Sequence, residues 1–164
     1  GEDDYIEMLE NVQNEAQRNF EQKLKSFRQI SHKSERLIYI NILLISSGTT
    51  LYTIFSGVLV PITLVPFALL GTLSIASSLI VHLPSNIRHG VSPVAIEKAL
   101  EQKPTRQAWL ETILDKGYYI WIREMKETHK HRVMYLKVSY ILLFLALFSL
   151  LAGVFLSLSI LPAK

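Results

Sequence analysis

The chain has 164 residues, 49% of them apolar, and its formal net charge of +3 is too small and too dispersed to indicate nucleic-acid binding. It contains no cysteine, which excludes disulfide scaffolds and thiolate zinc sites and leaves the redox compartment open. Charged residues are concentrated in some segments and absent from others, a segregation typical of membrane proteins with cytosolic parts. The sequence therefore predicts an all-α integral membrane protein with three transmembrane helices and a cytosolic helical stalk.

The N-terminal segment, residues 1–36, is polar and has no proline or internal glycine from Glu2 to Ile30. Its apolar residues fall at helical steps of three and four and predict an amphipathic cytosolic helix that packs on another helix of this chain or of a second protomer. A helix on the membrane surface is the alternative, which the mixed charges opposite the stripe disfavour. The stripe consists of Tyr5, Leu9, Val12, Ala16, Phe20, Leu24, Phe27 and Ile30.

A first membrane span is predicted at residues 37–56, which carry no formal charge and match roughly one bilayer thickness of helix. Its polar residues share one helical face: Asn41, Gly48, Thr49, Tyr52, Thr53 and Ser56. Such a face either packs against another helix through hydroxyl hydrogen bonds or lines a water-filled path in an oligomer. The lack of any acidic or basic ring favours packing.

A second span is predicted at residues 59–83, which pairs with the first as an antiparallel hairpin over residues 37–83. Pro61 and Pro66 lie near its start, where the first helical turn has no intrahelical donors to lose. We interpret His82, near its end, as an interfacial residue because no carboxylate lies inside any span to form a proton relay with it. The positions expected to pack against other helices are Gly71, Ser74 and Ser78.

The connection formed by residues 84–132 is polar and is expected to be cytosolic. Ser92 followed by Pro93 predicts a helix start, with a capping hydroxyl and a proline at the first helical position. Thr105 is expected to cap a second helix, whose apolar stripe can pair with the N-terminal one. That stripe consists of Leu110, Leu114, Tyr118, Trp121 and Met125.

The run from Met134 to Leu161 carries one charged side chain, Lys137, and exceeds the roughly 20 apolar residues that cross a bilayer. We expect it to be a third span within residues 133–164. A buried helix of a soluble protein is the alternative, but such helices rarely run so long without a polar face. No helix breaker separates this span from the preceding helix, so the two can form one rod. The small residues expected to pack on another helix are Ala146, Ser149, Gly153 and Ser157.

Basic residues gather where the spans meet the polar segments: Arg36, Arg88, Lys130, Arg132 and Lys137. We expect these residues to contact anionic lipid headgroups or another anionic ligand. The turn between the first two spans has no basic residue, so the positive-inside rule predicts a cytoplasmic N-terminus. After three spans the C-terminus would be external, and the expected location is the cell membrane.

No catalytic pattern is present in the sequence. It lacks a glycine-rich phosphate loop, a nucleophile elbow and any Asp or Glu inside a span. His129 and His131 are two residues apart, which directs them differently on a helix, whereas zinc-binding helical pairs are four apart. We therefore expect no enzyme activity, no cofactor and no metal site.

A resemblance to known membrane proteins is carried by Ser34-Glu35-Arg36, a two-span hairpin, Arg88-His89-Gly90-Val91-Ser92-Pro93, and Gly117-Tyr118-Tyr119-Ile120-Trp121-Ile122-Arg123-Glu124 before the last span. This layout resembles uncharacterised archaeal three-span membrane proteins. It is more distantly similar to the Pycsar transmembrane effectors and the SLATT group of prokaryotic anti-phage signalling. The resemblance implies a pore or membrane-disrupting assembly that a cyclic nucleotide switches on, and it assigns no residue roles.

Two functions are expected from these observations. The first is an oligomeric ion channel or pore-forming effector, with the polar face of the first span along the path. The alternative is a non-enzymatic membrane scaffold that recruits a partner through its cytosolic helices. The expected partners are the lipid bilayer, further copies of the chain, and a cyclic nucleotide or a protein at the cytosolic helices, with no nucleic acid.

Overall fold

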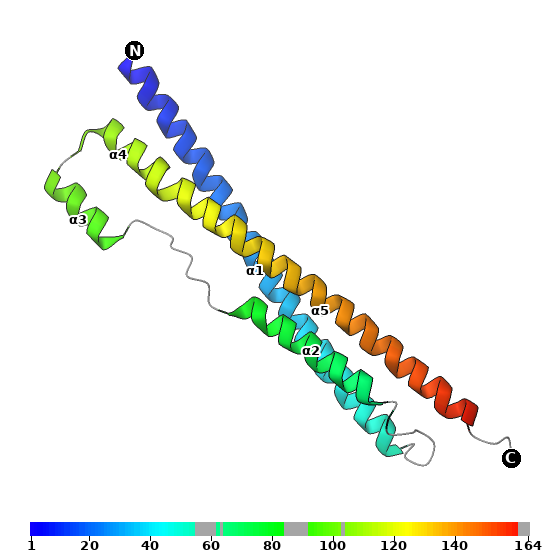
Figure 1. The fold of residues 1–164 in the computed structure, drawn as a ribbon. Coiled ribbons are helices and arrows are strands. Elements are labelled where there is room, and N and C mark those ends of the chain that lie inside the picture. The colour runs from blue at the N-terminus through cyan, green and yellow to red at the C-terminus, as the bar shows by residue number, and fades with distance from the viewer. Residues whose placement is uncertain (55–61, 63, 84–91, 103, 161–164) are drawn as a thin grey trace. The chain divides into compact units, whose positions relative to one another are not determined.

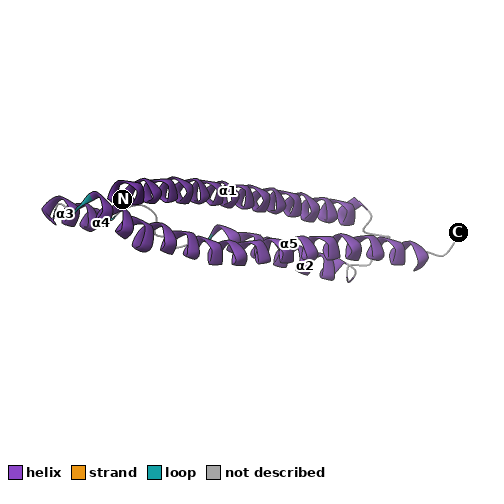
Figure 2. Cartoon of the chain, turned by 90° about the horizontal axis from the view of Figure 1, so that it is seen from above, coloured by secondary structure: helices purple, strands orange, loops and turns teal. Residues whose placement is uncertain are grey.

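The computed structural model describes residues 1–54, 62, 64–83, 92–102 and 104–160. Its elements are α1 (Glu2–Ile54), α2 (Leu64–His82), α3 (Pro93–Gln102), α4 (Arg106–Ile113), the π-helix η2 (Leu114–Tyr118) and α5 (Tyr119–Ile160), as Figure 1 shows. No strand occurs in these ranges, and nearly all of the described chain is helix (Figure 2). The all-α prediction is therefore confirmed.

Within the described ranges, three helices are long and apolar enough to cross a membrane: α1, α2, and the helix that runs through α4, η2 and α5. The 19 residues of α2 rise about 28 Å along the axis, close to the thickness of a bilayer's hydrocarbon core. The length and composition of these helices confirm the prediction of three apolar helices of spanning length.

Two of these helices join a polar segment to an apolar one without interruption. The polar residues 31–36 lie inside α1, because this stretch contains neither glycine nor proline. Likewise α5 continues for 42 residues through the basic residues that precede the third apolar run. Each helix therefore contains a polar and an apolar stretch with no break between them.

The two predicted helix starts after residue 91 are confirmed. The backbone N–H of Ala95 donates to the Ser92 hydroxyl at 3.2 Å, and Pro93 is the first residue of α3. The N–H of Ala108 donates to the Thr105 hydroxyl at 3.3 Å, which caps α4. These hydroxyls satisfy N–H groups that the first helical turn leaves without an intrahelical partner.

The chain divides into two compact units. We call Gly1–Arg28 with Pro84–Lys130 the head unit, and Gln29–Leu83 with His131–Lys164 the bundle unit. The boundaries expected from sequence, 36/37 and 132/133, differ from these by eight and two residues. Each unit is described by itself below.

The bundle unit contains three helical segments, from α1, α2 and α5. Ser34 and Asn41 of α1 bond to Ser78 and Ser74 of α2, so these two segments run antiparallel. Buried positions on all three follow alternating steps of three and four residues, which is the heptad spacing of left-handed helix packing. They are Ile30, Ser34, Leu37, Asn41 and Gly48 on α1, Phe67, Gly71, Ser74, Ser78 and Val81 on α2, and Leu136, Ser139, Leu143, Ala146, Gly153 and Ser157 on α5.

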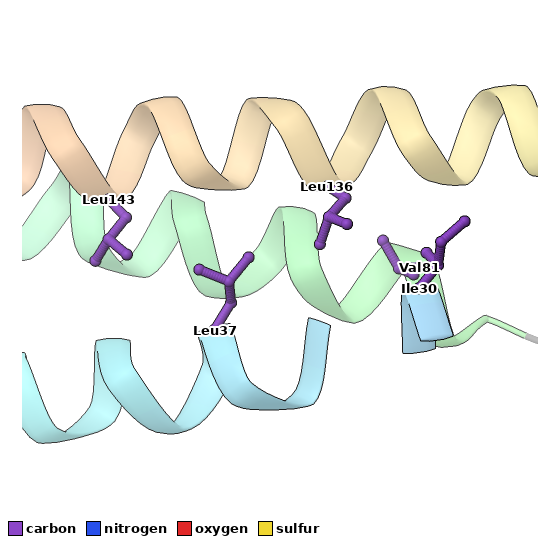
Figure 3. Packing of buried hydrophobic residues seen from close by; sticks show 5 residues of the cluster. All are labelled: Ile30, Leu37, Val81, Leu136 and Leu143. Carbon is purple, nitrogen blue, oxygen red and sulfur yellow. The ribbon is translucent and has the colours of Figure 1, made fainter. Parts of the chain in front are cut away.

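An apolar cluster closes one part of this bundle. It comprises Ile30, Leu37, Val81, Leu136 and Leu143. Figure 3 shows Leu136 and Leu143 directed from α5 toward Leu37 of α1. The cluster joins all three segments, so each apolar helix is held by the other two.

Among the described glycines, Gly48 marks the tightest contact between α1 and α2. A Cβ atom at this position would lie 2.5 Å from Cε1 of Phe67, whose ring is itself buried. A Cβ at Gly71 would lie 3.3 Å from Ile45, an easier contact to relieve. Glycine at position 48 therefore sets the separation of the two helices.

We predict that Gly48→Ala destabilises the bundle unit by about 1–3 kcal/mol, because the new methyl group overlaps the buried Phe67 ring. Thr50→Ala, on the exposed side of the same helix, is the matched control and should change stability by less than about 0.5 kcal/mol. Reversible unfolding of the detergent-solubilised protein measures both. Equal effects of the two substitutions would contradict the close packing at Gly48.

Candidate functional site

The bundle unit has a polar interior in which two helices meet through an asparagine. The side-chain amide of Asn41 donates to the Leu37 carbonyl at 2.8 Å and to the Ser74 hydroxyl at 3.0 Å. Asn41 and Ser74 are both fully buried. One amide group therefore uses both of its N–H donors, one within α1 and one across to α2.

Ser139 of α5 connects the same interior to the third helix. Its hydroxyl lies 2.7 Å from the Ser74 carbonyl, 3.0 Å from the Ser74 hydroxyl and 2.5 Å from the Ser78 hydroxyl. The Ser74 hydroxyl lies 2.8 Å from the Ser139 carbonyl, so the two serines exchange hydroxyl-to-carbonyl bonds. The Ser78 hydroxyl can then donate to that of Ser139, which gives every hydroxyl hydrogen one acceptor.

Ser34 adds the last connection, because its hydroxyl donates to the Ser78 carbonyl at 2.7 Å. Sequence reasoning missed Ser34 and Ser139 as packing residues, because Ser34 lies in the polar segment of residues 1–36 and Ser139 lies within the apolar run of the third span. One signal was available for Ser34, since Ser34, Asn41 and Gly48 are spaced seven residues apart. Nothing comparable in the sequence singled out Ser139.

The outside of the bundle unit is rich in large apolar side chains, although its inside contains polar ones. Phe148 and Phe155 of α5 are 72% and 77% exposed, whereas Ser139 and Ser74 are fully buried. Leucine and isoleucine side chains are likewise exposed on α1 and α2. Water-soluble proteins bury most such residues, so an exposed apolar surface of this extent is typical of an interaction site for a membrane or another protein.

The predicted polar stripe of α1 divides between two environments. Asn41 and Gly48 are buried against α2, and Tyr52 is half-buried. Thr49 and Thr53 are exposed, and each hydroxyl donates to a carbonyl of its own helix one turn earlier, at 2.8 and 3.0 Å. Ser56 lies outside the described residues. The structure thus places part of the stripe at a helix contact and part on the surface.

The small residues predicted to pack on α2 and α5 are mostly in the interior. Ser149 is half-buried, and the buried ones are Gly71, Ser74, Ser78, Ala146, Gly153 and Ser157. The Ser157 hydroxyl donates to the Gly153 carbonyl at 2.8 Å. Side chains of this size let helix backbones approach closely.

The basic residues predicted to contact anionic groups differ in their exposure to solvent. Arg36, Lys130 and Lys137 are exposed. Arg132 is half-buried, and its guanidinium donates to the Leu83 carbonyl at 3.1 Å, just beyond the end of α2. A cation is favourable at a helix C-terminus, where carbonyl groups lack intrahelical partners. Arg88 lies outside the described residues.

In the head unit, an aromatic cluster pairs α1 with the helix that follows Thr105. The ring of Phe20 lies 6.4 Å from that of Tyr118 and 6.0 Å from that of Trp121, between centroids. Tyr118 and Trp121 are 5.3 Å apart in an edge-to-face arrangement. The expected pairing of the two apolar stripes is present at these residues.

The π-helix η2 lies next to this cluster and contains the buried Gly117. A Cβ atom on Gly117 would lie 3.3 Å from the Trp121 ring, so the indole packs over the bare backbone. A π turn holds more residues than an α turn and therefore changes which side chains share a face. Nothing in the residue pattern predicts this π turn.

Polar contacts fix the outer part of the head unit. The Tyr5 hydroxyl donates to Glu111 at 3.1 Å, and Arg106 pairs with Glu10. The hydrogen bond to the Glu111 carboxylate, and its negative charge, raise the pKa of Tyr5 above its ordinary value. Further along, the His129 ring lies 5.6 Å from that of Phe27, and burial together with the charge of Lys23 lowers the pKa of His129.

Neither family models, nor curated proteins, nor solved structures yield a match to this chain. The functional argument therefore rests on the geometry and chemistry of its own residues.

We predict that Ser139→Ala weakens the bundle unit by about 1–2 kcal/mol, because it removes hydroxyl bonds to both Ser74 and Ser78. Hydrogen bonds between helices in apolar surroundings contribute about 0.6 kcal/mol each, up to about 1.7. Ser159→Ala is the control, since that exposed hydroxyl bonds only to the Leu156 carbonyl of its own helix. Unfolding of the detergent-solubilised variants measures the difference. If Ser139→Ala lowered the free energy of unfolding no more than Ser159→Ala, the hydrogen-bond network would not stabilise the packing of the three helices.

Proposed function

We propose that this chain is a multi-pass membrane protein whose bundle unit is the anchor and whose head unit is an interaction module in the cytoplasm. The observation that carries the proposal is the distribution of side chains in the bundle unit: serine and asparagine are buried beside a small apolar cluster, while many phenylalanine, leucine and isoleucine side chains are exposed. In water this surface would be strongly unfavourable, whereas lipid tails solvate it at no cost. The buried serine and asparagine side chains bond to one another or to backbone carbonyls, as a segment in lipid requires.

The charge distribution supports a cytoplasmic head unit. Residues 23–36 of α1 contain five Lys or Arg and one Glu, and residues 123–137 of α5 contain five Lys or Arg and two Glu. Both basic blocks precede an apolar run on the same continuous helix. Basic residues flanking a span are retained on the cytoplasmic side, so two helices independently favour one orientation.

The head unit has the surface of a binding module for another protein. Residues 1–21 of α1 contain seven acidic residues and one basic residue. Met8 and Val12, one helical turn apart, are exposed among these acidic side chains. An acidic helix with exposed apolar side chains suits a basic amphipathic partner.

Single-cysteine labelling tests the orientation, because the native chain has no cysteine to interfere. We predict that Asp3→Cys in intact cells resists a membrane-impermeant maleimide and reacts after permeabilisation, whereas Ala163→Cys reacts from outside. The protein should also remain in the membrane pellet after alkaline carbonate extraction. Labelling of both positions from one side, or release by carbonate, would contradict the proposal.

A second candidate function is an oligomeric ion channel or pore, and one observation favours it. The apolar segment of α1 ends in exposed hydroxyl residues: Ser46, Ser47, Thr49, Thr50 and Thr53. A hydroxyl-rich surface is unusual where lipid is the only neighbour, and in an assembly of several copies it could line a water-filled path. A cyclic nucleotide acting on the head unit is the proposed trigger.

Thr49→Leu combined with Thr53→Leu separates the two functions. For a channel, we predict that flux of ions or dye from liposomes, measured with and without cyclic nucleotides, falls at least tenfold because the path loses its hydroxyls. Thr72→Leu is the control, since the Thr72 hydroxyl of α2 is also exposed and bonds to a carbonyl of its own helix. Absence of flux from the native protein under every condition would exclude the channel and leave the anchor.

A further inference from the structure

The Lys and Arg residues of the bundle unit that the structure describes gather at one end, and no carboxylate pairs with them there. One of them, Arg132, donates to the Leu83 carbonyl. Two others, Arg36 and Lys137, are exposed. The only acidic residue in this unit is Glu35, and its carboxylate lies 3.3 Å from the His32 ring. Among the described residues, no carboxylate pairs with Arg36 or Lys137. Their charges are therefore available to an external anion.

Each of these two cations is followed, three residues later, by an exposed tyrosine. Tyr39 follows Arg36 and is 68% exposed, and Tyr140 follows Lys137 and is 39% exposed. Residues three apart lie on one helical face, so each cation and phenol form a neighbouring pair. In the described part of the chain, neither phenol hydroxyl has a hydrogen-bond partner. An unpaired hydroxyl next to an unpaired cation is a donor pair for a phosphate group.

The two pairs lie at the same depth along the bundle. Ser139 bonds to both Ser74 and Ser78, whose other partners are Asn41 and Ser34, so Ser139 lies at a level between residues 34 and 41 of α1. Lys137 precedes Ser139 by about 3 Å of helical rise, which brings it to the level of Arg36. The tyrosines, each one turn further on, share a level for the same reason.

An apolar strip continues from each pair in the direction of the span. The exposed residues four and seven positions after the cation are Ile40 and Leu43 on α1, and Ile141 and Phe144 on α5. Each face therefore presents, in order, a cation, a phenol and two large apolar side chains. This order matches a phospholipid, with its phosphate, its glycerol esters and its acyl chains.

We propose that Arg36 with Tyr39, and Lys137 with Tyr140, form two binding sites for anionic phospholipids of the cytoplasmic leaflet. The cation binds the phosphate, the phenol hydroxyl donates to a phosphate or ester oxygen, and the apolar strip packs against an acyl chain. This inference rests on the proposed placement of the bundle unit in a membrane. A free phosphate ion would use the cation and the phenol but would gain nothing from the strip.

The test measures lipid retention by the full chain, reconstituted in vesicles of equal parts phosphatidylglycerol and phosphatidylcholine and then extracted in an uncharged detergent. Native mass spectrometry counts the two lipids bound to the protein. We predict enrichment of phosphatidylglycerol, with its affinity reduced about fivefold per site by Arg36→Gln with Lys137→Gln. Tyr39→Phe with Tyr140→Phe should reduce the affinity about threefold.

The chain provides a matched control in the head unit. Lys116 and Tyr119 are exposed and also three residues apart. The position four residues after Lys116 is the exposed Ile120, but the position seven residues after it is the charged Arg123, so the strip of two apolar side chains is incomplete. Lys116→Gln with Tyr119→Phe should leave phosphatidylglycerol retention unchanged. An equal loss in this control would overturn the assignment, because it would reflect general charge attraction.

Three further outcomes would overturn the inference. If the double variant at Arg36 and Lys137 retained phosphatidylglycerol at the native level, the two cations would not belong to the binding sites. Displacement of the lipid by inorganic phosphate at equal concentration would indicate a phosphate-ion site. Failure of the native protein to enter vesicles would refute the proposed function as well, whereas entry without lipid preference would refute this inference alone.

Discussion

A hydroxyl or amide group inside lipid has no water to bond, so it must find its partner within the protein. In the proposed membrane placement, the bundle unit meets this constraint with a small set of side chains. Ser139 links Ser74 and Ser78, and Asn41 and Ser34 reach the same two serines from α1. Because these bonds join three helices and use short side chains, they fix helix separation and register together. Apolar packing alone would permit the helices to slide.

The proposed membrane placement also accounts for the exposed apolar side chains of the bundle unit. Lipid tails give these side chains no reason to leave the surface, so the interior combines close backbone approach and polar bonding with a small apolar cluster. Gly48 against Phe67 shows the consequence, since a single methyl group at that position has no room. The head unit differs: the half-buried rings of Phe20, Tyr118 and Trp121 contact one another, and charged side chains are exposed.

Sequence patterns predicted the helical class, the three apolar helices and the caps at Ser92 and Thr105, because those depend on composition and on local hydrogen bonding. The interior network was predicted only in part. Gly71, Ser74 and Ser78 stood out as small residues at helical spacing, but Ser34 lay among charges and Ser139 among apolar residues. Their roles depend on which helix faces which, and that is decided by contacts between distant segments. The π turn at residues 114–118 likewise has no local signature.

The most direct test of the account is a nitroxide scan along α5 in bilayers, from residue 143 to residue 155, which the cysteine-free chain permits. Collision with oxygen, which dissolves in lipid, should peak at the exposed positions and reach minima at the buried ones, while a water-soluble nickel chelate reaches none of them. The expected maxima are Phe144, Phe148, Leu151 and Phe155, and the expected minima are Leu143, Ala146 and Gly153. Access of the nickel chelate to the phenylalanine positions, or oxygen collisions without helical periodicity, would contradict the proposed membrane placement of the bundle unit.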